Sequence, residues 1–359
     1  MRIMIVTDAW FPQTNGVVRT LAHTAAWLGR FGHEVRTLTP RNFRSIPCPT
    51  YPEIRLSLFP GRALGKAISA FGPEALHIAT EGPLGLAARR HCVSRGMRFT
   101  TSYHTQFPQY VRARFPIPLD ASYWALRRFH AAGTRCMVST RTLRQDLAAR
   151  GFKNLATWRR GVDTDMFRPQ PKDFLDLPRP IAACVGRVAI EKNIEAFLQM
   201  PWSGSKMVIG DGPERPRLEK LYPAVKFTGY RFQEDLARHL AAADVMVFPS
   251  RTDTFGLVNL EAMACGVPVA AYPVTGPIDV IQDGVTGALD EDLGRAALRA
   301  LALDPGTCRR HALQYGWDVS TREFEGNLVA CHSAGGESVA VPSERVTAPA
   351  AASAGVSRS

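Results

Sequence analysis

The sequence lacks several patterns that would each indicate a particular class of protein. It contains no run of about 18 apolar residues, so no segment is expected to span a membrane. The seven cysteines are scattered and include no Cys-x-x-Cys pair, which argues against a disulfide framework or a zinc site and favours a reducing compartment. The apolar run at residues 3–6 is too short for a signal peptide. These absences together favour a cytoplasmic location.

A glycine-rich dinucleotide-binding loop is also missing. Residues 8–16 follow the first apolar run and contain one glycine, where the pyrophosphate-binding fingerprint needs three. This argues against a dinucleotide-dependent oxidoreductase, an alternative that NAD binding by the purified protein would revive.

The net charge of +12 is unevenly distributed. Residues 1–160 hold 24 Lys and Arg against 7 Asp and Glu, a net charge of +17, whereas the remaining residues hold 20 against 25, a net charge of −5. A basic first half indicates contact with an anionic surface or substrate. Nucleic acid and anionic lipid headgroups both fit, as does a solvated arginine-rich surface without a partner. Because no nucleic-acid-binding motif is recognised, nucleic acid is not expected as a partner.

Apolar runs alternate with helical patterns along most of the chain. Strands are expected at residues 3–6, 35–38, 75–78, 98–102 and 136–138, and in a second series at 181–185, 206–209, 225–227, 245–248 and 267–271. Strand–helix alternation predicts parallel sheets. The expected fold class is therefore α/β, with two doubly wound, Rossmann-like domains that face each other across a cleft.

Composition indicates where these domains begin and end. The first domain is placed at residues 1–164, a linker with four prolines at 165–180, and the second domain at 181–315. A last helix is expected within 316–332, and 333–359, which has no Phe, Tyr or Trp, is expected to be a disordered tail. Ligands of open α/β sheets bind beyond the carboxyl ends of the strands, so the site is expected in the cleft.

Two carboxylates, Asp253 and Glu261, lie on either side of the start of an apolar helix expected after residue 256. The start of a helix has unpaired N–H groups and a partial positive charge, which suit a diphosphate. The carboxylates supply acceptors for sugar and ribose hydroxyls. The alternative is a capping aspartate and a solvated glutamate, and spacing alone does not distinguish the two.

Two further loops hold side chains that suit a nucleotide-sugar. Arg187 and Lys192 follow the first strand of the second series, where fixed cations would stabilise a departing nucleoside diphosphate. Ion pairs with Glu191 or Glu195 are the alternative. His104 follows a strand of the first series and would donate to a sugar hydroxyl, although a lone histidine is more often structural.

Glycines close two other strands. The Asn15-Gly16 pair can take a positive φ, which lets the backbone approach a ligand, although such a pair is usually only a turn. Gly210 opens a tight loop at residues 210–213 where a flat base would lie, but the phosphate-binding glycine spacing is absent. The Asp-x-Asp at residues 163–165 precedes the linker rather than following a nucleotide-binding strand, so it is rejected as a metal site.

The motifs together resemble family 4 of the retaining glycosyltransferases, which have the GT-B fold. In order, they are PQTNGV, SYHTQFPQY, RRGVDTDMFRP, GRVAIEKN, IGDGP and TDTFGLVNLEAMACGVP. The resemblance covers nearly all of residues 1–330. It implies transfer of a hexosyl group from a UDP- or GDP-sugar to a hydroxyl with retention of configuration, no metal, and no cofactor besides the co-substrate. The family's usual mechanism is front-face displacement, in which the leaving phosphate takes the acceptor proton.

The resemblance also implies roles for individual residues. Asp253 and Glu261 occupy the two ends of the family's E-x7-E motif and would bind the sugar and the ribose. Gly16 would approach the diphosphate or sugar, and His104 would contact the transferred sugar. The catalytic set is His104, Arg187, Lys192 and Asp253. The donor-binding set is Gly16, Arg187, Lys192, Gly210, Asp253, Phe255, Gly256, Leu257 and Glu261.

Two departures from the family pattern bear on the substrates. Asp253 stands where Glu is commoner, and Asn15-Gly16 stands where a glycine pair is commoner. The TDTFG variant looks like the subgroup that glycosylates lipids, including sulfoquinovosyl, glucuronosyl and mannosyl transferases. The expected acceptor is a membrane lipid such as diacylglycerol, with the protein bound peripherally to the inner face of the membrane. The alternatives are a polysaccharide or other soluble acceptor, and a non-catalytic scaffold that binds sugar nucleotides.

Contacts with that membrane are expected at residues 55–71, 86–98 and 111–129. The last range places Tyr123, Trp124 and Phe129 among arginines. The alternative is that these aromatic side chains pack under the first sheet. No feature of the sequence indicates an oligomeric state.

Overall fold

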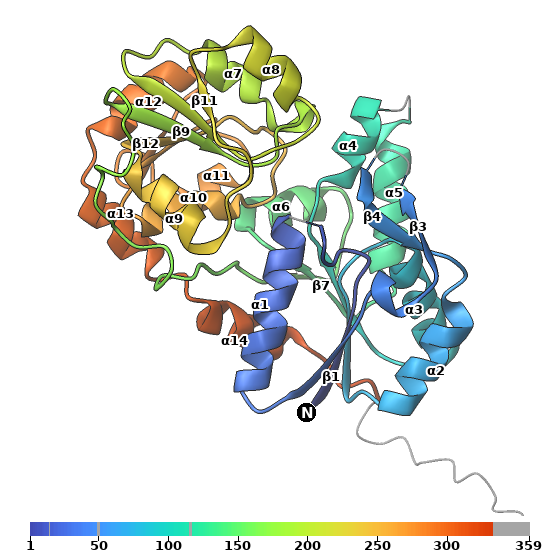
Figure 1. The fold of residues 1–359 in the computed structure, drawn as a ribbon. Helices are drawn as coiled ribbons and strands as arrows, with labels where there is room; N and C mark the ends of the chain where they lie inside the picture. The colour runs from blue at the N-terminus through green and yellow to red at the C-terminus, as the bar shows by residue number, and fades with distance from the viewer. Residues whose placement is uncertain (14, 49–50, 115–116, 333–359) are drawn as a thin grey trace, which may run out of the picture.

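The chain folds into two lobes, each built around a parallel sheet. The computed structural model describes residues 1–13, 15–48, 51–114 and 117–332. The sheet of the first lobe has six strands in the order β2-β1-β5-β6-β7-β8, and that of the second lobe has six in the order β11-β10-β9-β12-β13-β14. Figure 1 shows the sheets in separate lobes, each flanked by helices. A strand order that runs outward in both directions from the first strand is doubly wound, which confirms the expected fold class.

The elements have the following bounds. The first sheet contains β1 Arg2–Val6, β2 Glu34–Leu38, β5 Ala75–Ile78, β6 Thr100–Tyr103, β7 Arg135–Val138 and β8 Leu155–Thr157. The second sheet contains β9 Ile181–Val185, β10 Ser205–Ile209, β11 Lys226–Phe227, β12 Val245–Phe248, β13 Val269–Ala271 and β14 Gly287–Leu289. The helices up to residue 149 are α1 Gly16–Arg30, α2 Gly61–Phe71, α3 Pro83–Ser94, α4 Phe107–Arg114, α5 Leu119–His130 and α6 Arg141–Ala149. Those that follow are α7 Ile194–Gln199, α8 Arg215–Leu221, α9 Gln233–Ala242, α10 Leu257–Ala264, α11 Pro277–Val280, α12 Leu293–Leu301, α13 Pro305–Ala312 and α14 Trp317–Asn327.

Each expected strand overlaps a strand of the structure, but four strands were not expected. β8 and β14 have three residues each and lie at the edges of their sheets, so they leave only a short apolar signal. β3 (Ser45–Cys48) and β4 (Tyr51–Ser57) form an antiparallel pair outside the main sheets. Their half-buried, charged sequence carries no continuous apolar run of the kind that marks a buried parallel strand.

The first strand shows why these apolar runs form a sheet covered on both faces. Met4 and Val6 pack in a cluster with α2 and α3, whereas Ile3 and Ile5 pack in another with α1 and α14. All four side chains are fully buried. Alternate residues of a strand point to opposite faces, so an uninterrupted apolar strand needs helices on both sides.

The last helix returns to the first lobe. Trp317 of α14 stacks on His23 of α1 with ring centroids 4.7 Å apart, and Phe324 joins the core under β1. Arg159 also pairs with Glu323 of α14. Figure 1 shows α14 beside α1, far from the rest of the second lobe. The chain therefore crosses between the lobes twice. The expected tail at 333–359 lies outside the described residues.

The aromatic side chains near α5 divide between core and surface. Tyr123 and Phe129 are buried in clusters of the first lobe, as the packing alternative predicted for them. Trp124 is 57% exposed. Only Trp124 of the three is thus available for contact with a membrane.

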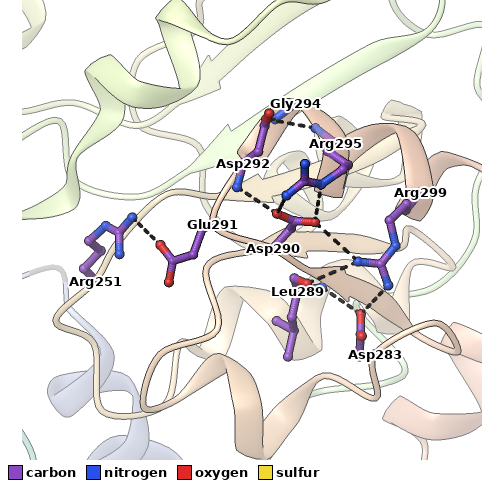
Figure 2. Close-up of polar contacts among 9 residues, drawn as sticks. All are labelled: Arg251, Asp283, Leu289, Asp290, Glu291, Asp292, Gly294, Arg295 and Arg299. Carbon is purple, nitrogen blue, oxygen red and sulfur yellow. Dashed lines mark hydrogen bonds and ion pairs between the residues drawn. The ribbon is translucent and has the colours of Figure 1, made fainter.

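A set of ion pairs holds the end of β14 and the start of α12 together (Figure 2). The carboxylate of Asp292 accepts from the N–H groups of Gly294 and Arg295 at 2.9 and 3.1 Å and so caps the helix. Asp290 accepts from Arg295 Nε at 2.6 Å. This bond to Arg295 is the main reason that the pKa of Asp290 is lowered to about 2. Arg251, which follows β12, joins the group through Glu291 at 2.9 Å.

Candidate active site

Loops at the carboxyl ends of both sheets meet where the two lobes touch. The hydroxyl of Thr254, in the loop after β12, donates to the carbonyl of His104, which follows β6, at 2.7 Å. The hydroxyl of Ser139, which follows β7, donates to the carbonyl of Thr254 at 3.0 Å. Thr142 at the start of α6 binds Asp279 of α11 at 3.2 Å. The loops after β6, β7 and β12 therefore meet between the two lobes, where the site was expected.

Two helices begin at this junction and point their amino ends toward it. A Cβ atom on Gly16, the first residue of α1, would lie 3.4 Å from Leu257 Cδ1, at the start of α10. Gly256 precedes α10 with φ +77°, a conformation that favours glycine. Phe255 is buried and fixes the turn before it. Two helix starts in proximity combine their N–H donors and partial positive charges, which suits a diphosphate.

Glu261 lies inside this junction rather than in solvent. It is 2% exposed, and its Oε1 atom pairs with Arg19 of α1, in the other lobe. Its Oε2 atom has no hydrogen-bond partner among the described residues. Burial of an unsatisfied carboxylate oxygen is costly, so this atom is suited to accept a hydroxyl of a bound ligand. The alternative of a solvated glutamate is wrong.

The two candidate cations contact carboxylates at the same junction. Lys192 Nζ lies 2.6 and 2.8 Å from the two carboxylate oxygens of Asp253. Arg187 Nη2 donates to Glu53 of β4, in the first lobe, at 2.7 Å. Glu195, which was one alternative partner, accepts from Arg217 at 2.9 Å. Lys192 and Asp253 are thus brought together at the loop that leads into α10, whereas Arg187 reaches across to Glu53 of the first lobe.

His104 is part of a buried chain of hydrogen bonds. Arg160 Nη2 lies 3.2 Å from His104 Nδ1, and Ser102 Oγ lies 3.0 Å from His104 Nε2. Ser102 Oγ continues to His77 Nε2 at 2.8 Å, and His77 Nδ1 reaches Thr100 at 2.8 Å. Because a guanidinium only donates, His104 Nδ1 accepts, and Nε2 carries the proton and donates to Ser102.

Burial, and then the charge of Arg160, hold the pKa of His104 well below its ordinary value. The imidazole is therefore neutral. Both ring nitrogens of His104 are already bonded, and its carbonyl faces the second lobe through Thr254. Contact between His104 and the sugar stays a prediction. It requires that one hydrogen bond of the imidazole ring is broken, or that the sugar binds the backbone carbonyl instead.

Arg160 was missed from the sequence. Its side chain is 4% exposed and lies over the ring of Trp158 at 4.1 Å. Burial lowers its pKa to about 9, and no ion pair with it occurs among the described residues. The signal that would have found it is its place in the RRGVDTDMFRP motif directly after β8. Arg19 and Glu53 were missed too, and they belong to no motif that marks a ligand.

Gly210 has a structural reason to be glycine. It has φ +148°, and a Cβ atom there would lie 1.9 Å from the carbonyl oxygen of Gly186. The loops that follow β9 and β10 therefore pack backbone against backbone. Contact between Gly210 and a base stays a prediction. In the rejected Asp-x-Asp, Asp163 Oδ1 accepts from the N–H groups of Asp165 and Met166 at 3.2 and 3.0 Å and closes a turn.

The chain is similar to known enzymes over most of its length. Residues 14–166 match the family model described as Glycosyltransferase Family 4, and residues 179–302 match that described as Glycosyl transferases group 1. The GDP-mannose-dependent alpha-mannosyltransferase of Mycolicibacterium smegmatis is 30% identical, over 92% of this chain and 97% of that protein. Sulfoquinovosyl transferase SQD2 of Arabidopsis thaliana is 30% identical, over 89% and 72%. Alpha-monoglucosyldiacylglycerol synthase of Streptococcus pneumoniae is 26% identical, over 90% and 83%.

Solved structures confirm the arrangement of the two lobes as a known fold. Anabaena HepE, in complex with UDP and glucose, superposes with a TM-score of 0.69 at 15% identity, over 91% of this chain and 98% of that one. The six ordered motifs, the two doubly wound sheets and these similarities agree. The chain belongs to glycosyltransferase family 4, has the GT-B fold, and is an enzyme that transfers a hexosyl group from a nucleotide-sugar donor.

Proposed function

We propose that this enzyme transfers a hexosyl group from a UDP- or GDP-sugar to a hydroxyl of a membrane lipid such as diacylglycerol, with retention of configuration. The observation that carries the donor side is the buried Glu261 at the meeting point of α1 and α10. A carboxylate with one oxygen unsatisfied lies in α10, whose start is close to that of α1, and Asp253, paired with Lys192, lies in the loop before α10. Such a site has acceptors for hydroxyls and donors for phosphates within one junction.

The donor would lie across the start of α10. Glu261 would accept from the ribose hydroxyls, and the diphosphate would lie at the amino ends of α1 and α10, against Arg187 and Lys192. Asp253, released from Lys192, would accept from sugar hydroxyls, helped by the N–H groups of residues 255–257. The shorter aspartate, in place of the commoner glutamate, would set how far the sugar reaches into the site.

The residues present can support front-face displacement. The bond from the anomeric carbon to the leaving phosphate oxygen breaks, and the acceptor oxygen bonds to the same face of that carbon. The acceptor proton passes to the leaving phosphate. Arg187 and Lys192 would stabilise the negative charge that develops on the diphosphate, and the groups of the junction would hold donor and acceptor in place. This mechanism uses no protein nucleophile and needs no metal ion.

The acceptor side of the proposal rests on charge and on similarity. The name of the similar Streptococcus pneumoniae enzyme indicates a diacylglycerol glycolipid. The first 160 residues carry a net charge of +17, which suits an anionic membrane. Within the described residues no helix is long and apolar enough to cross a bilayer. We therefore propose peripheral binding at the inner face of the membrane. A polysaccharide or other soluble acceptor is the alternative.

Two measurements test this function. Thermal-shift titration with a panel of UDP- and GDP-sugars should identify a donor that raises the melting temperature, because a ligand of the folded state stabilises it. That donor is then incubated with the enzyme and with vesicles that contain diacylglycerol, and the glycolipid product and its anomeric configuration are analysed. Product formed only from soluble acceptors, or equal turnover by the Arg187→Ala/Lys192→Ala double variant, would refute the proposal.

A further inference from the structure

The first lobe has a cavity at the opposite edge of its sheet from the candidate active site. It has a volume of about 660 Å³ and is bounded by α3, the carboxyl end of α5 and the loop before β8. The residues that line it on the loops, 131–132 and 151–154, precede β7 and β8, whereas the active-site loops follow strands. The cavity is therefore separate from the junction between the lobes.

Four cationic side chains line this cavity and no carboxylate does. They are Arg89, Arg127, Arg128 and Lys153. None of them forms an ion pair with another described residue, whereas other arginines of the same lobe, such as Arg159, do. The charge of the cavity is thus uncompensated by the surrounding side chains.

Backbone carbonyls hold two of these guanidinium groups in place. Arg89 donates through Nε to the carbonyl of Phe129 and through Nη2 to that of Arg128, both at 3.0 Å. Arg127 Nη1 donates to the carbonyl of Arg150 at 2.9 Å. A carbonyl orients a guanidinium without cancelling its charge. Burial, and then the charge of Arg128, lower the pKa of Arg89. The effect of Arg128 is expected where cations lie close to one another.

The cavity adjoins exposed apolar side chains. Trp124, which also lines it, is 57% exposed, and Leu86 and Val93 of the neighbouring α3 are 55% and 53% exposed. Leu86 and Val93 are seven residues apart, so they share a face of α3 that also includes Arg89 and Arg90. Tryptophan and aliphatic side chains beside arginines are typical of a surface that enters the interface of a bilayer. A groove for nucleic acid would not need the exposed aliphatic residues.

We propose that this cavity binds the phosphate of an anionic membrane lipid headgroup, and that α3 and α5 form the surface that faces the membrane. The phosphate would lie among Arg89, Arg128 and Lys153, and Trp124, Leu86 and Val93 would contact the acyl region. This inference rests on the proposed lipid-glycosylating function and identifies the surface used for it. It also separates the lipid that anchors the enzyme from the lipid that reacts in the cleft.

The test is co-sedimentation of the full-length enzyme with two kinds of vesicle, phosphatidylcholine alone and an equal mixture of phosphatidylcholine and phosphatidylglycerol. Arg128→Gln/Lys153→Gln removes two exposed cations of the cavity. Each cation near a membrane contributes about a fivefold factor in binding, so this variant should bind the mixed vesicles about 25-fold more weakly. Lys220→Gln/Lys226→Gln, which removes two exposed cations of the second lobe, is the matched control, and its binding to the mixed vesicles should fall much less.

Further variants separate the contributions of charge and apolar contact. Arg89→Gln should weaken binding too, but it removes bonds to two carbonyls of α5, so its melting temperature is checked beside it. Trp124→Ser should weaken binding without changing the charge. In the wild type, tryptophan fluorescence should shift to shorter wavelength on the mixed vesicles and lose this shift in Trp124→Ser.

Several results would overturn the inference. Equal losses of vesicle binding in the cavity variant and in Lys220→Gln/Lys226→Gln would indicate general charge attraction. A fluorescence change with inorganic phosphate alone, equal to that with vesicles, would indicate a site for free anions, and tight binding of a short nucleic acid without vesicle binding would indicate another partner. Donor-induced thermal stabilisation is measured on the same samples. If the wild type shows no donor-induced stabilisation, the proposed function fails. If a cavity variant keeps this stabilisation and still binds vesicles as the wild type does, only the inference about the cavity is overturned.

Discussion

Arg19 of α1 and Glu261 of α10 form an ion pair that joins the two lobes through the proposed ribose-binding carboxylate. Glu261 is buried, whereas about a third of the Arg19 side chain is exposed. The cation that pairs with this buried carboxylate therefore comes from the other lobe. If Glu261 binds the donor as proposed, donor binding would be coupled to the contact between the lobes, because Glu261 Oε2 has no partner among the described residues while Oε1 contacts Arg19.

The first prediction concerns this pair. Arg19→Met leaves a buried carboxylate without its cation, which costs about 3–5 kcal/mol for fully buried pairs and less here because Arg19 is partly exposed. We expect a loss of about 1–3 kcal/mol in the free energy of unfolding, measured by urea denaturation. Glu261→Gln should lose little stability but weaken donor binding by about 1.5–3 kcal/mol, the contribution of a hydrogen bond to a charged group.

The control for Arg19 is Arg159→Met, which removes the pair with Glu323 within one lobe. About half of the Arg159 side chain is exposed, so its loss should cost no more than about 1 kcal/mol and leave donor affinity unchanged. Equal donor affinity of Glu261→Gln and the wild type would contradict the role given to Glu261.

The second prediction concerns the cations of the junction. Arg187→Ala and Lys192→Ala should each lower kcat by about 10²–10³, the loss found when one donor to a developing charge is removed. Their KM for the donor should change less than kcat if the charge is stabilised mainly in the transition state. Steady-state kinetics with the identified donor checks this. Arg217→Ala, which removes bonds to Glu195 and Glu214 in the same lobe, should leave kcat near the wild-type value.

The sequence predicted the architecture because apolar strands and ordered motifs are local signals. The run at residues 3–6 and the motif around residues 252–268 can each be read without knowledge of the rest of the chain. The pairing of Arg19 with Glu261 cannot be read from a local pattern, because 242 residues separate the two. The angle between the lobes decides which side chain of α1 meets α10. The contact of Glu53 with Arg187 could not be predicted either, since Glu53 lies on a strand pair that carries no apolar pattern.

The third prediction concerns Arg160 as a positioning residue. Burial, and then the charge of Arg160, hold the pKa of His104 well below its ordinary value, and the bond from Arg160 to Nδ1 places the proton of the neutral imidazole on Nε2. Arg160→Gln removes the charge, so the pKa of His104 should rise toward its ordinary value. The acidic limb of kcat/KM against pH should then move to higher pH, and Arg160→Lys should restore part of the wild-type profile. Identical profiles in Arg160→Gln and the wild type would contradict this coupling.

The fourth prediction concerns the turn that starts α10. Gly256 has φ +77°, and a Cβ atom there would lie 2.6 Å from Asn259 Nδ2 and 3.0 Å from Phe248 Cζ. Gly256→Ala should therefore lose at least about 1–2 kcal/mol of stability and displace the N–H groups proposed to bind the sugar. Gly29→Ala is the control, because it lies in α1 with nothing within 4 Å and should gain about 0.5–1 kcal/mol. Both are measured by urea denaturation, and the donor-induced thermal shift should be lost only in Gly256→Ala.

The last prediction concerns acid stability. His77 is fully buried between Thr100 and Ser102, and burial, followed by the charge of Arg160, lowers its pKa to about 3. In the unfolded chain a histidine has a pKa of about 6.5, so between these two values the unfolded state binds a proton that the folded state does not.

The free energy of unfolding should therefore fall as the pH decreases from about 6.5, by up to about 1.4 kcal/mol per pH unit for this one group. The pKa of His104 is also lowered, so it adds to the slope with the same sign. His77→Gln should give a shallower dependence on pH, whereas His332→Gln, at an exposed position, should keep the wild-type slope. Urea denaturation at a series of pH values measures both. If His77→Gln and the wild type lose stability in parallel, the buried histidine is not the source of acid sensitivity, and protonation of other groups must account for it.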